Sequence, residues 1–217
     1  MRLLGVRMAR SIWIIPQYFL NPKGLFLRPA ALQLKDRYQF LKSPFDNNTI
    51  GTQEIKYENG AFTDKAGTPI HVDSLVLHPN GIVVDTRAST DAGDALLTDI
   101  GNWLAKDFGL PAFTDLPVKR LYASELNIFL EKPPTFFNPK LKPFVDAVSA
   151  TIADDATGPA DFMMMQLTTD QTRSPSPSTF RIDREVSTSF SENRYYSYAP
   201  IATSAHIKLL QLLESCV

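Results

Sequence analysis

Arginine, aspartate and tyrosine side chains gather in two neighbouring segments near the C-terminal end of the sequence. They are Arg181, Asp183, Arg184, Arg194, Tyr195, Tyr196 and Tyr198. If the two segments pair as a hairpin, one face of it is rich in guanidinium and phenol groups. Such groups are favoured at interfaces because each has a broad apolar body and a polar tip. We therefore predict a partner- or ligand-binding surface here. Ordinary cross-strand pairing within a sheet is the alternative.

A second pattern could bind a metal ion. His71 and Asp73 are one residue apart, so on a strand both side chains point to the same face, and His78 follows. No further ligand stands at a typical spacing. The pattern therefore favours polar side chains on the solvent face of an antiparallel hairpin, and we expect no metal site.

A third pattern could hold an anion, because Arg87 lies just before a predicted helix N-terminus. Asp91 and Asp94 would place negative charge at the same spot and oppose an anion. Ser89-Thr90-Asp91 can cap this helix, since a side-chain oxygen can accept a hydrogen bond from a free helix amide. Helix capping therefore explains this segment better than ligand binding.

Familiar catalytic signatures are absent from the sequence. It contains no glycine-rich phosphate-binding loop, no dinucleotide fingerprint and no nucleophile elbow. With three histidines and one cysteine, Cys216 near the C-terminal end, a nucleophilic triad has few available members. The catalytic residues, if any exist, are unknown, and we expect no cofactor.

Composition points to a folded protein. The chain has 217 residues, of which 44% are hydrophobic and 21% charged, with a net charge of −1. These values are ordinary for globular proteins and argue against disorder. A nearly neutral chain is also a poor nucleic-acid binder, because phosphate binding needs a basic surface. The apolar run after the N-terminal arginines is too short for a signal peptide or a membrane span, so we expect a cytoplasmic protein that does not bind membranes.

Apolar periodicity and turn residues predict the elements. Segment 11–19 is a predicted strand and 29–42 a helix; a strand over 55–62 is interrupted by a turn at Asn59-Gly60, and a hairpin of 70–77 and 82–84 precedes a helix over 90–108. The later segments are a strand over 121–130, a helix from 138 to 153, a buried strand over 162–167, strands over 180–186 and 194–198, and a last helix starting at Thr203 or Ser204.

The order strand, helix, several strands, helix is therefore predicted twice. The tripeptides Asn21-Pro22-Lys23 and Asn138-Pro139-Lys140 stand at the same place in each series. We predict an α+β protein in which antiparallel sheets are covered by helices on one face. The halves would span 1–110 and 111–217, either as a duplication or as one continuous unrepeated domain.

The sequence does not identify a function. Because catalytic signatures are absent and Arg and Tyr cluster near the C-terminal end, we expect a non-enzymatic protein-binding or assembly subunit of a larger complex. Its partner would be another protein or further copies of itself. The alternative is an enzyme or small-ligand-binding protein with a cleft between the two halves.

Overall fold

The computed structural model describes residues 1–16, 28–43, 54–133, 139–152, 160–170, 172 and 178–215. The strands are β1 (Arg2–Ile14), β2 (Ile55–Thr63), β3 (Pro69–His78), β4 (Gly81–Thr86), β5 (Lys119–Phe129), β6 (Met164–Thr168), β7 (Thr179–Arg184) and β8 (Arg194–Ala199). The α-helices of these residues are α2 (Arg28–Arg37), α3 (Thr90–Phe108), α4 (Lys142–Ile152) and α5 (Thr203–Ser215).

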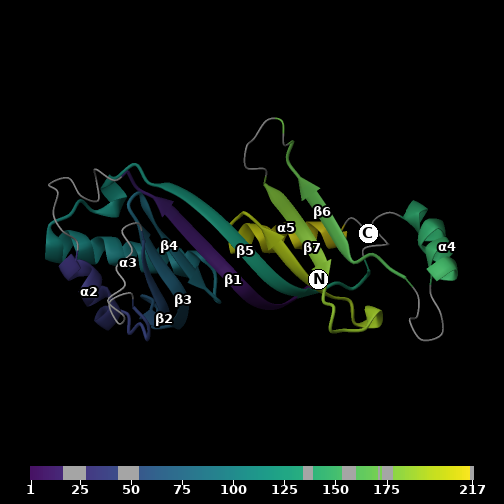
Figure 1. Cartoon of the computed structure of the whole chain (residues 1–217), viewed down its shortest axis with the longest axis horizontal. Coiled ribbons are helices and arrows are strands. Elements are labelled where there is room, and N and C mark those ends of the chain that lie inside the picture. Colours follow the sequence, from purple (N-terminus) through teal and green to yellow (C-terminus); the bar gives the residue numbers. More distant parts are fainter. Residues whose placement is uncertain are drawn as a thin grey trace. The chain divides into compact units, whose positions relative to one another are not determined.

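The described strands form an antiparallel sheet in the order β2-β3-β4-β1-β5-β8-β7-β6 (Figure 1). Together with the helices, this sheet confirms the predicted α+β class. None of the described helices is long and apolar enough to cross a membrane.

The chain divides into two compact units. Residues 8–124 and 201–204 form what we call the N-terminal unit, and residues 1–7, 125–200 and 205–217 form the C-terminal unit. These bounds differ from the predicted halves because β1 and β5 each contribute residues to both units. The order strand, helix, three strands, helix occurs twice along the chain. A duplication of 1–110 in 111–217 stays a prediction, which superposition of the two series would test.

In the N-terminal unit, α2 and α3 share one core with the strands. Trp13, Leu34, Val84 and Leu97 are among its buried members. Ser89 caps α3 as predicted, since its hydroxyl accepts a hydrogen bond from the Ala92 amide. This capping holds α3 in the register in which its apolar side chains meet the strands.

The outer edge of β2 is occupied by the chain that follows α2. Helix α2 ends at Arg37, earlier than predicted, and residues 38–42 turn back along the strand. The Leu41 and Lys42 amides donate to the carbonyls of Asn59 and Glu58, at 3.1 and 3.2 Å. The predicted turn at Asn59-Gly60 is wrong. Asn59 does have a positive φ of 55°, but the ladder to β3 continues on both sides of it, so β2 stays one strand.

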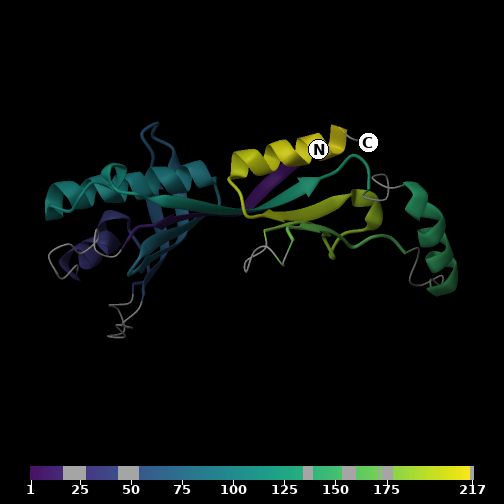
Figure 2. The ribbon, with the colours of Figure 1, turned by 90° about the horizontal axis from the view of Figure 1, so that it is seen from above.

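In the C-terminal unit, α5 packs against β5, β7 and β8. Figure 2 shows the helix along one side of these strands. The buried side chains of this core are Leu126, Ile128, Leu130, Ile182, Tyr195 and Leu210. The helix is therefore fixed by apolar residues that alternate along its neighbouring strands.

Strand β6 and helix α4 are much less buried than predicted. The sequence predicts a buried strand over 162–167, yet Met164 is 53% and Leu167 63% exposed. No described helix lies over these side chains closely enough to bury them. On α4, Phe144 is 64% exposed, although the apolar residues of this helix have the spacing of a helix that packs against a core.

Strand β1 begins at Arg2 and ends at Ile14, earlier than the predicted 11–19. Its polar residues have partners: Arg10 donates to Asp85 at 2.7 and 2.9 Å, and Arg7 lies 3.5 Å from Glu125. These pairings allow arginines within a sheet strand. Residues 21–23 and Asn138, from the two Asn-Pro-Lys segments, lie outside the described residues.

Candidate protein-binding surface

Strands β7 and β8 pair as the predicted hairpin. Arg181 lies opposite Tyr198, and Asp183 lies opposite Tyr196. Side chains directly opposite each other share a face of an antiparallel sheet, and successive residues alternate between faces. These four side chains therefore lie on the face away from α5. We call this the outer face; it also includes Arg194, which lies opposite Glu185 in the extension of the hairpin.

Charges of both signs alternate across the outer face. Arg181 Nε lies 2.7 Å from Asp183 Oδ2, and Arg194 Nε lies 3.6 Å from Glu185 Oε2. The side chains of Arg181 and Arg194 are 47% and 43% exposed. Exposed pairs of this kind contribute little to stability because water screens them. Their guanidinium groups therefore remain able to contact another molecule.

An arginine from the start of the chain joins this face. The Arg7 guanidinium lies 4.2 Å from the centre of the Tyr196 ring and 3.5 Å from Glu125 Oε1. Burial, followed by a hydrogen bond to Glu185, raises the pKa of Tyr196. Sequence reasoning missed Arg7 and Glu125 in this role. Only knowledge of which strands lie side by side could have found them.

Two of the predicted site residues lie on the opposite face. Arg184 and Tyr195 are 2% and 1% exposed. Arg184 donates to Asp161 Oδ2 at 2.8 Å and to the Phe190 carbonyl at 3.1 Å, and its guanidinium lies 5.0 Å from the Tyr195 ring centre. Burial raises the pKa of Tyr195 to about 12. Both side chains hold the unit together, so they are not part of the outer face.

A serine and a histidine meet in the interior of the C-terminal unit. Ser197 Oγ lies 2.8 Å from His206 Nε2, and both residues are fully buried. Burial lowers the pKa of His206 to about 4, so the imidazole is neutral at neutral pH. Although this spacing resembles a nucleophile and its base, a substrate cannot reach the pair. The contact therefore stabilises α5 on the sheet.

The residues considered as metal ligands do not converge. His71 Nε2 lies 3.3 Å from Asp73 Oδ1, but Asp73 also accepts from Arg87 Nε at 3.2 Å. His78 instead lies 3.9 Å from Glu54. In the part of the chain that the structure describes, no three His, Cys, Asp or Glu side chains form a group that could hold a metal ion.

The anion site considered before α3 is taken by internal contacts. Arg87 is paired with Asp73, and Asp85 accepts from Arg10 and from Ser74 Oγ, the latter at 3.0 Å. Ser89 caps the helix, as expected. These pairings place a carboxylate beside each of the two arginines, which disfavours a bound anion.

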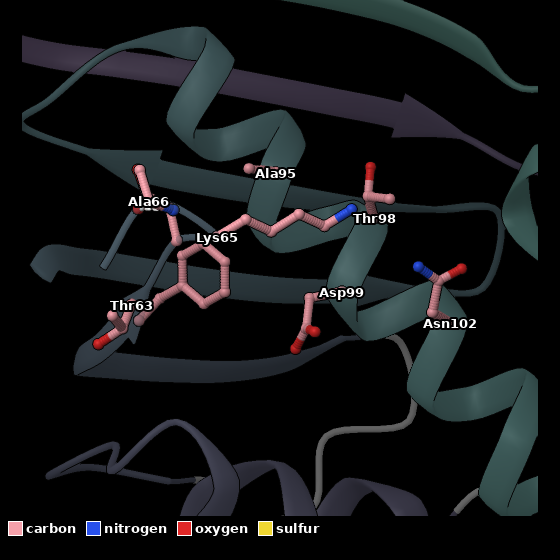
Figure 3. Close-up of a pocket in the computed structure, with 9 residues that line it drawn as sticks. Thr63, Lys65, Ala66, Ala95, Thr98, Asp99 and Asn102 are labelled. Carbon is pink, nitrogen blue, oxygen red and sulfur yellow. Dashed lines mark hydrogen bonds between the residues drawn. The ribbon is translucent and has the colours of Figure 1, made fainter. Parts of the chain in front are cut away.

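The N-terminal unit carries a pocket of about 530 Å³ between the β2–β3 turn and α3 (Figure 3). The side chain of Lys65 extends toward α3, where Thr98, Asp99 and Asn102 line the opposite wall. Tyr38 Oη donates to Asp99 Oδ2 at 2.7 Å, which fixes that carboxylate. Within the described residues Lys65 has no ion-pair partner. The pocket thus offers the Lys65 ammonium group, the Asp64 and Asp99 carboxylates and several uncharged polar groups to a small polar molecule.

No protein-family model matches the chain, and no curated protein or solved structure matches it either. Contacts, burial and charge on the chain itself therefore carry the functional proposal. They single out two features, the outer face of the C-terminal unit and the pocket of the N-terminal unit.

Proposed function

We propose that this chain is a non-enzymatic assembly subunit that binds a partner protein through its outer face. The observation that carries the proposal is the hairpin register, which collects Arg181, Arg194, Tyr196 and Tyr198 on one face while α5 packs on the other. Arginine and tyrosine are the residues that most often dominate protein–protein binding energy.

The physical state of these side chains supports binding. The outer-face tyrosines are half-buried, and the Tyr196 ring is already stacked by Arg7, so less rotamer freedom remains to be lost on association. Charges of both signs alternate, which favours a partner surface with the complementary pattern. The proposed partner is therefore a folded protein with a mixed-charge surface.

A matched pair of arginines tests the outer face. Arg181 and Arg87 are both exposed and each is paired with an aspartate, but only Arg181 lies on the outer face. The tagged chain is used to isolate a stoichiometric complex from native extract, followed by sizing and titration with the purified partner. We expect Arg181→Ala with Tyr198→Ala to weaken binding roughly 30-fold or more, since hot-spot truncations cost about 2 kcal/mol. Arg87→Ala should leave binding unchanged.

The proposal would be overturned if no stoichiometric complex forms. It would equally be overturned if the Arg181→Ala, Tyr198→Ala chain binds as the unaltered chain does. Circular dichroism of the variant shows whether the sheet has stayed folded, so a loss of binding can be assigned to the surface.

The pocket favours small-ligand binding as a second candidate function. Lys65 would hold an anionic group of the ligand, and Asn102 would fix its orientation by hydrogen bonds. In thermal-shift measurements with a panel of small anionic metabolites, a metabolite that binds should raise the melting temperature of the chain. Lys65→Met should abolish that increase. If the unaltered chain is stabilised by no member of the panel, the pocket is not a binding site for this class. The predicted cleft between the halves stays a separate prediction.

A further inference from the structure

Strand β6 stands at one end of the sheet and pairs only with β7 among the described strands. The Arg184 amide donates to the Met163 carbonyl, and the Thr169 amide donates to the Ser178 carbonyl. In an antiparallel ladder such bonded positions alternate. Odd-numbered residues of β6 therefore bond to β7, and the N–H and C=O groups of Met164, Gln166 and Thr168 point away from it.

The strand at the other end of the sheet order shows how an edge is covered. Residues 38–42 bond to the outward groups of β2, with Glu58 both donating to and accepting from Lys42 at 3.1 and 3.2 Å. The described residues provide no such cover for β6. An open row of backbone groups is a template for another strand.

The sequence of β6 carries none of the usual protection. Met164–Thr168 reads Met-Met-Gln-Leu-Thr, with no charge and no proline. Natural edge strands commonly avoid pairing by means of lysine, proline or bulges. Because β6 is uncharged, a second β6 can approach it without placing like charges opposite each other.

We propose that β6 pairs antiparallel with β6 of a second copy of the chain, about a two-fold axis at Gln166. The pairing deepens the proposed assembly function, on which it rests, by naming the partner at this edge. With the even-numbered residues facing outward, Gln166 bonds to Gln166 of the partner subunit. Met164 then lies opposite Thr168 of the partner subunit.

This register is complementary in its side chains as well. Met165 lies opposite Leu167 of the partner subunit, in a position without backbone bonds where side chains come closest. Leu167, now 63% exposed, would gain an apolar neighbour. The two glutamine amides can exchange hydrogen bonds across the axis, because each carries a donor and an acceptor.

The interface is small. A pairing of two five-residue strands buries much less than a standard stable interface of about 1,600 Å². We therefore expect a dimer that dissociates on dilution.

A charge swap at Gln166 tests the pairing directly. In the proposed register Gln166→Glu places two carboxylates opposite each other, and Gln166→Lys does the same with two ammonium groups. We expect sedimentation equilibrium of the full chain to show a concentration-dependent dimer, each variant alone to be monomeric, and an equimolar mixture to form the heterodimer. Lys56→Glu, on β2 at the other end of the sheet order, is the matched control and should dimerise like the unaltered chain.

Cysteine pairs test the register in a chain that also carries Cys216→Ser. Gln166→Cys should form a disulfide-linked dimer on mild oxidation, because the axis places the two positions opposite each other. Met164→Cys and Lys56→Cys should not form one.

The proposal is overturned if the unaltered chain is monomeric at every concentration, if the variants still dimerise, or if the mixture does not restore the dimer. The outer face is tested separately. The Arg181→Ala, Tyr198→Ala chain should still dimerise, because those substitutions leave the backbone groups of β6 in place.

Discussion

Helices α2 and α4 occupy the same place in the two series of elements but differ in burial. On α2, the side chains of Ala30, Ala31 and Leu34 are 1–3% exposed, whereas α4 leaves Phe144 64% exposed. Tyr57 on β2 donates to the Ala31 carbonyl at 2.6 Å, which ties α2 to its sheet. An apolar stripe therefore predicts a helix, but a facing surface is needed to bury it.

The edge strands β2 and β6 also differ in how far other segments cover them. The chain leaving α2 covers β2, and no described segment covers β6 in this way. In the C-terminal unit, β6 and α4 therefore both carry exposed apolar side chains, among them Met164, Leu167 and Phe144.

The largest expected effect comes from matched core and surface truncations. Leu34→Ala on α2 removes a buried side chain and should lower the free energy of unfolding by about 3 kcal/mol. Phe144→Ala on α4 should cost less than about 1 kcal/mol, because that side chain is mostly exposed already. Urea unfolding of the purified chains measures both. Equal losses would contradict the difference between the two helices.

Buried polar contacts differ between the units in their response to pH. In the N-terminal unit the Thr203 amide donates to Thr90 Oγ1 at 3.0 Å, and neither group titrates. In the C-terminal unit His206 is buried in its neutral form, with a pKa of about 4 against an ordinary value of 6.5. The unfolded chain therefore binds a proton between these values that the folded chain does not. Stability is fully present above pH 6.5 and falls as the pH drops toward 4.

The His206 contribution should decrease by about 2 kcal/mol between pH 7 and pH 5. His206→Gln removes this titration, so its unfolding free energy should fall less over that range. Denaturation of both chains at the two pH values gives the difference. If the two chains lose stability in parallel, His206 does not govern the change.

The smallest expected effect concerns the segment that covers β2. Tyr38 donates to Asp99 at 2.7 Å and its carbonyl accepts from the Ala61 amide. Tyr38→Phe deletes the bond to Asp99 and the bond that the hydroxyl accepts from Arg37 Nε, keeps the carbonyl bond, and should cost about 1 kcal/mol. Thermal unfolding of Tyr38→Phe against the unaltered chain measures it. A loss as large as that of Leu34→Ala would show that this one hydroxyl holds the whole edge.

Local sequence patterns predicted most elements but not their burial. Ser89 marked the start of α3 because capping chemistry is local. The exposure of Met164 and Leu167 could not be predicted, since apolar strand residues look the same whether or not another layer covers them.

The candidate surface was predicted in part. Alternation along β7 and β8 explains why Arg181 and Tyr198 share a face while Arg184 is buried on the other. The seven residues could not be divided between the two faces from sequence alone, because the division depends on the hairpin register. Arg7 was missed because its place beside Tyr196 depends on which distant strands meet.

Residue-resolved hydrogen exchange of the Gln166 amide, followed over a series of protein concentrations, tests the central claim most directly. This amide points away from β7, so in a monomer it should exchange fast, whereas the Leu167 amide is protected. We predict that protection of Gln166 rises with concentration and is lost in Gln166→Lys at the same position. Fast exchange of Gln166 at every concentration would contradict assembly through β6.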